Sequence, residues 1–215
     1  MEHTPKYMKA TIKEGKNNVP FTHHHSRAET IATVPLKEEA IALSWPLVEF
    51  ARRRHSRTPL LHFDVGFDPR IDEWNIRANR GGYSTPLSRN ERDLSVSTHC
   101  ILTRMVIRCR GLEKWPVVVE REQGLRCIDV FRAIYDTYHK PLTPAELVSL
   151  DSNYIERCRP AFEQRCEDSP GLALFNQRRG MRRVDLLRGR RIFKGLTRTS
   201  ESGANWVLQF DEPQR

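Results

Sequence analysis

Residues 115–147 read WPVVVEREQGLRCIDVFRAIYDTYHKPLTPAEL, a strand pattern followed by a turn and by two helix patterns. The three valines after Pro116 are β-branched, which predicts a central strand. Apolar residues then recur with the spacing of one helix face: Val130, Phe131, Ile134, Tyr135 and Tyr138. At the next helix, Thr143 and Glu146 have the spacing of a reciprocal N-terminal cap, and Pro144 fits the first helical position. This stretch therefore predicts one strand and then two helices.

Further strands are predicted on both sides of this stretch. Before it, Leu60–Val65, Ile71–Ile76 and Ile101–Val106 have strand patterns, whereas the glycines and proline of residues 80–92 predict a loop. After it comes a third helix, which Pro160 should kink or split. Two segments around Arg188-Gly189-Arg190, residues 181–187 and 191–196, predict a hairpin, and residues 206–210 alternate as a half-buried final strand.

The order of these elements predicts an α+β fold, because strands and helices do not alternate regularly. We expect a mixed or antiparallel sheet, built from N-terminal strands, a C-terminal hairpin and a final strand, packed by a central block of two to three helices. Residues 1–58 are predicted to be a flexible, partly helical tail, because residues 1–33 show no helix or strand period and Pro46 breaks a helical pattern over residues 37–54. Residues 59–212 are predicted to form a single globular domain.

The composition restricts the class of protein. The formal net charge of +9 favours acidic partners. The five cysteines are odd in number and include no Cys-x-x-Cys pair, so they predict reduced, mostly buried thiols. No stretch approaches the roughly 20 apolar residues that span a bilayer, and the first residues lack the apolar core of a signal peptide. We therefore expect an intracellular protein of the cytoplasm or nucleus, without membrane insertion.

Several motifs, taken in order, resemble one known family. They are Leu60–Val65, Trp115-Pro116 followed by Asp129–Tyr135, Pro141–Glu146, Gly180–Leu187, Phe193–Leu196 and Trp206–Leu208. Their order and spacing resemble a domain of unknown function that is abundant in mushroom-forming basidiomycete fungi, over about residues 59–210. The resemblance implies a family and a domain boundary. It implies no activity, catalytic residue or ligand.

A cluster of polar residues is the candidate site for chemistry. His62 and Asp64 point to the same face of a strand, and with Asp68 they could bind a divalent metal or share a proton. The alternative is local hydrogen bonding, because Asp68 and Asp72 lie in a turn. The histidine run His23–His25 is expected to be an unstructured polar stretch. No nucleophile elbow or phosphate loop is found, so the sequence predicts no catalytic residue, metal or cofactor.

Basic charge is concentrated near the C-terminus. Between Gln177 and Arg198 there are nine Lys or Arg residues and one Asp, an excess of eight out of the net nine of the chain. A ribbon this basic could follow a phosphate backbone. The predicted polyanion-binding residues are Arg178, Arg179, Arg188, Arg190, Arg191, Lys194 and Arg198. Arg182 and Arg183 belong to a family motif, and one of them is expected to pair with a carboxylate at the core edge. The alternative is a solvated or internally paired face.

The sequence leaves three hypotheses about function. The first is a non-enzymatic interaction module whose basic hairpin contacts an acidic protein or nucleic acid. The second is an enzyme of unrecognised type that uses polar groups around His62 and Asp64, and the third is a non-specific nucleic-acid binder. A pocket that collects His62, Asp64 and another polar group would favour the enzyme. A flat, uncovered arginine surface would favour the interaction module.

Overall fold

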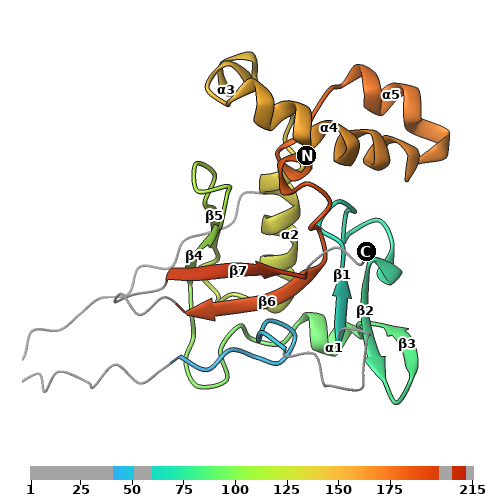
Figure 1. Ribbon diagram of the computed structural model, residues 1–215. Coiled ribbons are helices and arrows are strands. Elements are labelled where there is room, and N and C mark those ends of the chain that lie inside the picture. Colours follow the sequence, from blue (N-terminus) through green and yellow to red (C-terminus); the bar gives the residue numbers. More distant parts are fainter. Residues whose placement is uncertain (1–40, 51–59, 199–204, 212–215) are drawn as a thin grey trace, which may run out of the picture. The chain divides into compact units, whose positions relative to one another are not determined.

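The structure is a computed structural model that describes residues 41–50, 60–198 and 205–211, all of which fall within one unit, Ala40–Arg215 (Figure 1). The strands are β1 (Leu61–Phe63), β2 (Ile76–Arg80), β3 (Tyr83–Pro86), β4 (Arg104–Cys109), β5 (Val117–Glu120), β6 (Phe193–Arg198) and β7 (Asn205–Phe210). The α-helices are α1 (Arg89–Arg92), α2 (Cys127–Tyr138), α3 (Pro144–Val148), α4 (Ser152–Glu167) and α5 (Ala173–Arg178). Three 3-10 helices are η1 (Glu73–Asn75), η2 (Pro170–Leu172) and η3 (Arg183–Leu187). These described elements confirm the α+β fold class.

A small antiparallel sheet has the strand order β1-β2-β3. Its inner face is apolar and buried, with Leu61, Phe63 and Ile76 at most 1% exposed. Residues 80–92 were expected to be a loop, but β2 and β3 form a hairpin there and α1 follows it. The reason is the pair Gly81 and Gly82, whose φ angles of 56° and 92° suit the two-residue turns that match strand twist.

A second sheet has the order β5-β4-β7-β6, in which β4 and β7 are parallel and the other pairs antiparallel. The valine run, expected as a central strand, is the edge strand β5. Val117 and Val119 are buried, whereas Val118 is 46% exposed. Valine favours any half-buried pleated surface, so the run could not distinguish an edge position from a central one.

Three phenylalanines join the two sheets and α2. The ring centroids of Phe131 lie 5.1 Å from Phe63 and 5.4 Å from Phe193, both in edge-to-face geometry. The backbone continues the connection, because the amide of Val65 donates to the carbonyl of Arg191 at 3.0 Å. β1 and the segment before β6 are therefore held together by both side chains and backbone.

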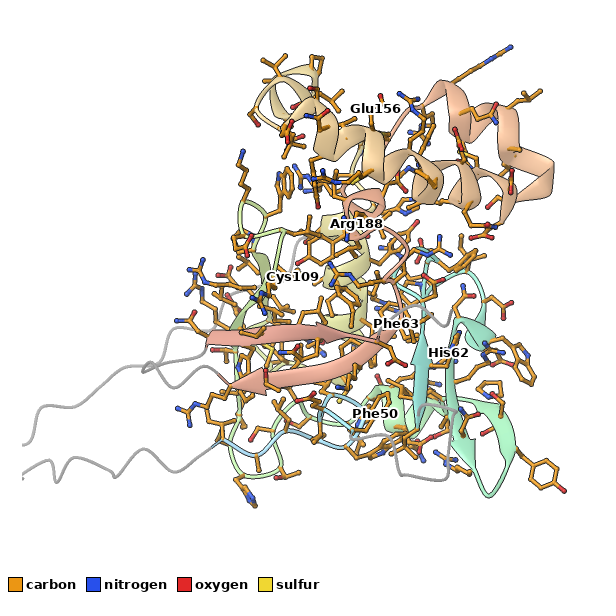
Figure 2. The ribbon with its side chains drawn as sticks, in the orientation of Figure 1. Phe50, His62, Phe63, Cys109, Glu156 and Arg188 are labelled. Carbon is orange, nitrogen blue, oxygen red and sulfur yellow. The ribbon has the colours of Figure 1, made fainter. Side chains whose placement is uncertain are left out.

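The helices confirm most of the expectations from the sequence. The apolar face of α2 is buried, and Thr143 and Glu146 form the predicted capping box at the start of α3. Helix α4 runs through Pro160 and is not split. Pro160 and Glu156 are both exposed, so water can bond the Glu156 carbonyl that proline leaves without a donor. Figure 2 shows Glu156 on the outer side of α4.

The predicted hairpin of residues 181–196 is wrong in its first arm. Residues 183–187 form the 3-10 helix η3, and Arg188 follows in a left-handed conformation with φ of 52°. The cause is Asp185, which accepts from the backbone amide of Arg182 at 2.7 Å and so favours a tight turn. Strand β6 pairs with β7 instead.

Two other segments differ from expectation. Residues 71–76 were expected to be a strand, but Asp72 caps η1 by accepting from the Trp74 amide at 2.8 Å, so β2 begins at Ile76. Residues 41–50, part of an expected helical segment, form no helix. They bridge to Ser97 and Leu196, and Leu47 is fully buried. The rest of that segment and residues 1–33 lie outside the described residues, and the limits of the tail and the domain stay predictions.

Two expectations from composition can be compared with the structure. All five cysteines lie in the described residues as free thiols, and four of them are buried while Cys100 is exposed. Among the described helices, none has the length and apolarity needed to cross a membrane.

Candidate functional site

The outer face of β1 and β2 carries a pocket of about 270 Å³, here named the β1–β2 pocket. Its lining residues are His62, Asp64, Phe67, Trp74, Asn75 and Arg77. Side chains alternate along a strand, so His62 lies on the side of β1 opposite Phe63, as Figure 2 shows. Arg77 pairs with His62 across the strands. The pocket is therefore the solvent side of the small sheet, whose other side is core.

Asp64 is held by structural partners. Its Oδ1 accepts from the Gly66 amide at 2.8 Å, and its Oδ2 lies 3.1 Å from Nη2 of Arg191. Arg191 also contacts Asp168 at 2.7 Å. Burial raises the pKa of the Asp64 carboxyl, and the positive charge of Arg191 opposes that rise. One oxygen of the carboxylate thus closes a local turn at Gly66, and the other fixes the end of β1 to the segment before β6.

His62 is half-buried in the pocket wall. Burial lowers the pKa of its imidazole, and the neighbouring charge of Arg77 lowers it further, against a smaller opposite effect of Asp64. The ring is therefore neutral at pH 7. A neutral imidazole donates through one nitrogen and accepts through the other, so His62 can either donate a hydrogen bond to a ligand or accept one from it.

Arg77 is a cationic group of the pocket for which the described residues supply no acceptor. Its Nε is buried and bonds no acceptor, and within the described residues its guanidinium forms no ion pair. The guanidinium group of arginine is a permanent cation in proteins. It is a fixed, uncompensated cation beside His62.

Two aromatic rings complete the pocket. Trp74 is 51% exposed, and the guanidinium of Arg191 lies 5.8 Å from the centroid of Phe67. The side-chain amide of Asn75 donates to the carbonyl of Asp68 at 2.7 Å, which fixes its orientation. The pocket therefore combines one cation, one neutral imidazole, the Arg191-paired carboxylate of Asp64, one amide oxygen and two aromatic rings.

The other acidic candidates serve the turn. Asp68 accepts from the backbone amide of Arg70 at 2.9 Å and from its Nε at 2.8 Å. Burial alone would raise the pKa of Asp68, but the hydrogen bonds from Arg70 lower it overall. The described part of the chain contains no group of three His, Cys, Asp or Glu side chains that could hold a metal ion. His23–His25 lies outside the described residues.

The predicted polyanion-binding residues occupy four different places. Arg178 and Arg179 lie at the end of α5, Arg188 and Arg190 follow η3, and all four are exposed. Arg191 is internally paired with Asp64 and Asp168. Lys194 and Arg198 lie on β6, and Lys194 pairs with Glu49 at 3.1 Å. Because η3 replaces the first arm of the hairpin, these side chains do not line one ribbon.

Arg182 and Arg183, which were not counted among the predicted polyanion-binding residues, are structural. Arg183 pairs with Glu146 at 2.8 Å and lies over the ring of Trp115, which confirms the expected pairing with a carboxylate. Arg182 is only 5% exposed.

Sequence reasoning missed Arg77 and Trp74, because residues 71–76 were assigned to a strand. The signal was present at Asp72, a residue type that favours helix N-caps. Had Asp72 been taken as a cap, the strand would have started at Ile76, but the pairing of Arg77 with His62 depends on the strand register. A second cavity, lined mainly by arginines, gave no local signal, because its residues span positions 69–132.

Comparison with known proteins gives a family without an activity. No curated protein and no solved structure matches the chain. The family of unknown function DUF6699 matches residues 61–204, inside the expected range of 59–210. This match covers most of the chain, from β1 to the residue before β7, and it includes both cavities. The chain therefore belongs to DUF6699, a family of unknown function.

Proposed function

We propose that the chain is a non-enzymatic binding module that recognises a small aromatic carboxylate in the β1–β2 pocket. The observation that carries this proposal is Arg77, whose buried Nε has no acceptor. A buried donor without a partner costs about 1–3 kcal/mol. The carboxylate of a ligand would supply the acceptor and the opposite charge.

The rest of the pocket supports an aromatic body on that carboxylate. Trp74 and Phe67 offer apolar rings, and aromatic pairs are favourable at centroid separations of about 4.5–7 Å. The volume of about 270 Å³ is slightly below the range of roughly 300–1,000 Å³ for drug-sized ligands, which favours a small one. The neutral imidazole of His62 can donate to the ligand.

The enzyme of unrecognised type is the second candidate, and the meeting of His62 and Asp64 in one pocket favours it. Catalysis by Asp64 would need a carboxylate free to exchange a proton. Both Asp64 oxygens are bonded, to the Gly66 amide and to Arg191. We therefore prefer a binding function of this pocket over a catalytic one.

Binding of nucleic acid or of an acidic protein is a weaker candidate function than the other two. It rests on four exposed arginines, Arg178, Arg179, Arg188 and Arg190, which lie on two separate elements instead of one ribbon. A cytoplasmic or nuclear location and a source among mushroom-forming fungi also stay predictions.

The test is isothermal titration with 1-naphthoate and with 1-naphthamide, its uncharged analogue. We expect the carboxylate to bind more tightly. The change Arg77→Gln should weaken carboxylate binding by about 10- to 100-fold, the range of a charge-assisted hydrogen bond. Arg108→Gln, at an exposed position of β4, is the matched control for lost charge. Equal binding of acid and amide, or an unaffected Arg77→Gln variant, would refute the proposal.

A second readout separates binding from catalysis. After long incubation of the protein with 1-naphthoate, mass spectrometry should recover the ligand unchanged. Conversion that disappears in a His62→Gln variant would establish the enzyme candidate instead.

A further inference from the structure

The second cavity has a volume of about 280 Å³ and is here named the arginine cavity. It lies between α1, the start of α2 and the loop that leads to η1. Its lining residues are Pro69, Arg70, Arg89, Arg92, Asp93, Arg126, Ile128 and Arg132. It shares no lining residue with the β1–β2 pocket, so a ligand of the arginine cavity would be independent of the proposed function.

Two of the cavity's arginines are neutralised by carboxylates. Arg70 bonds Asp136 at 2.7 Å in addition to Asp68. Arg126 donates to Asp93 at 2.8 Å and to Asp129 at 3.1 Å. These two side chains shape the wall but contribute little free charge.

Arg92 is fixed without being neutralised. Its Nε donates to the carbonyl of Leu87 at 2.7 Å, and its Nη2 donates to the carbonyl of Glu73 at 3.0 Å. Backbone carbonyls orient a guanidinium but do not cancel its charge. Among the described residues, Arg92 has no carboxylate partner, so its Nη1 remains available in a preset orientation.

Arg132 adds further uncompensated charge, whereas Arg89 forms a long, exposed ion pair with Asp93. The Nε of Arg132 is buried without an acceptor, and no ion pair of Arg132 occurs in the part of the chain that the structure describes. The side chain of Arg89 is 95% exposed and lies 3.8 Å from Asp93, too far for a hydrogen bond. Asp93 is the acidic group of the lining, and Arg126 already bonds it. Positive charge therefore prevails in the cavity.

We propose that the arginine cavity binds a small phosphate monoester. Guanidinium groups match phosphate oxygens with two parallel hydrogen bonds, and a dianion can satisfy Arg92 and Arg132 together. The volume suits a phosphate with a short organic group and excludes a nucleic-acid duplex. The source can be a free ester or a phosphorylated side chain, because both present the same dianion.

The test uses the full chain at low salt with glycerol 3-phosphate as the probe and glycerol as its uncharged analogue. Calorimetry should detect binding of the ester alone. Arg132→Gln should weaken that binding by about tenfold or more, as expected for the loss of a charge-assisted hydrogen bond. Because Arg132 bonds no described group, this change should leave the melting temperature intact.

Two control variants show whether the effect of Arg132→Gln is specific to the arginine cavity. Arg108→Gln removes the same charge from an exposed position on β4, and Arg77→Gln alters the β1–β2 pocket. Both should keep the affinity for the ester within about twofold: Arg108→Gln because a surface charge contributes little, and Arg77→Gln because the two cavities share no lining residue. If wild type binds no ester, or if Arg108→Gln weakens binding as much as Arg132→Gln, the proposal is overturned.

A phosphoserine peptide distinguishes the two sources. Affinity for the peptide well above that for glycerol 3-phosphate would identify a phosphorylated protein as the ligand. Equal or weaker affinity would identify the free ester. In both cases the loss of binding must follow Arg132→Gln.

Discussion

Replacing Asp185 with asparagine tests the pair that shapes the C-terminal half of the domain. Asp185 is 1% exposed, and its side chain contacts that of Arg165 in α4, which is 5% exposed. The two N–O distances are 2.7 Å and 2.9 Å, and Asp185 also accepts from the Arg182 amide at 2.7 Å. Asparagine keeps nearly the same shape and one acceptor but leaves the charge of Arg165 uncompensated.

The size of the effect depends on burial. Breaking a buried ion pair by removing one partner costs about 3–5 kcal/mol, against a typical domain stability of about 5–15 kcal/mol. For a domain of this size, the melting temperature should fall by about 6–20 °C. The free energy of unfolding is measured by urea denaturation, followed by circular dichroism and tryptophan fluorescence.

Two further variants make the result specific. The double variant Arg165→Met with Asp185→Asn should recover part of the loss, because no unpaired buried charge remains. Glu156→Gln breaks the exposed pair with Arg159 on the same helix and should leave the urea midpoint unchanged. If Asp185→Asn unfolds at the same urea concentration as Glu156→Gln, the reasoning about the buried pair fails.

The remaining predictions concern the core, the domain limit, pH and the exposed arginines. Trp206 is 3% exposed, so Trp206→Ala should lower the free energy of unfolding by about 3–5 kcal/mol; an unchanged melting temperature would refute this. Because Leu47 is fully buried, limited proteolysis followed by mass spectrometry should leave a stable fragment that begins before residue 41; a fragment lacking Leu47 would contradict it. Burial lowers the pKa of His139 to about 3, so the unfolded state gains a proton as pH falls below about 6.5 and stability falls with it. In urea denaturation at pH 7 and pH 5, His139→Gln should lose less stability than wild type. If Arg188 and Arg190 bind nucleic acid, replacing both with serine should reduce affinity and its salt dependence in fluorescence anisotropy, without a change in circular dichroism.

The elements that the sequence predicted correctly have local causes. The cap of α3 depends on Thr143 and Glu146, three residues apart, and the face of α2 depends on spacing alone. The tight turn of η3 also has a local cause, the bond from the Arg182 amide to Asp185, but it was missed because the apolar residues around Asp185 were taken as one arm of a hairpin. Strand β5 lies at the sheet edge because β7, and not β5, continues the sheet on the other side of β4. The residues of β5 do not indicate this order.

Local patterns and long-range contacts also differ in how well they predicted the candidate sites. His62 and Asp64 share a face because of strand alternation, and that part of the β1–β2 pocket was predicted. Arg77 joins them through strand pairing, and the arginine cavity joins three segments that are distant in the chain. Contacts of this kind arise from the tertiary fold, so neither spacing nor composition could indicate them.

The cluster of Phe63, Phe131 and Phe193 has a consequence for the order of events during synthesis. The first two rings are made long before the third, and roughly 60 residues separate Phe131 from Phe193. At translation rates of about 5–20 residues per second, that interval lasts about 3–12 seconds. Until then, Phe63 of β1 and Phe131 of α2 lack the ring of Phe193, which packs against both of them in the folded domain. Figure 1 shows β6 and β7 in red, near the end of the chain. The nascent chain therefore passes through a stage with exposed apolar surface, in which chaperone binding or aggregation is most favourable.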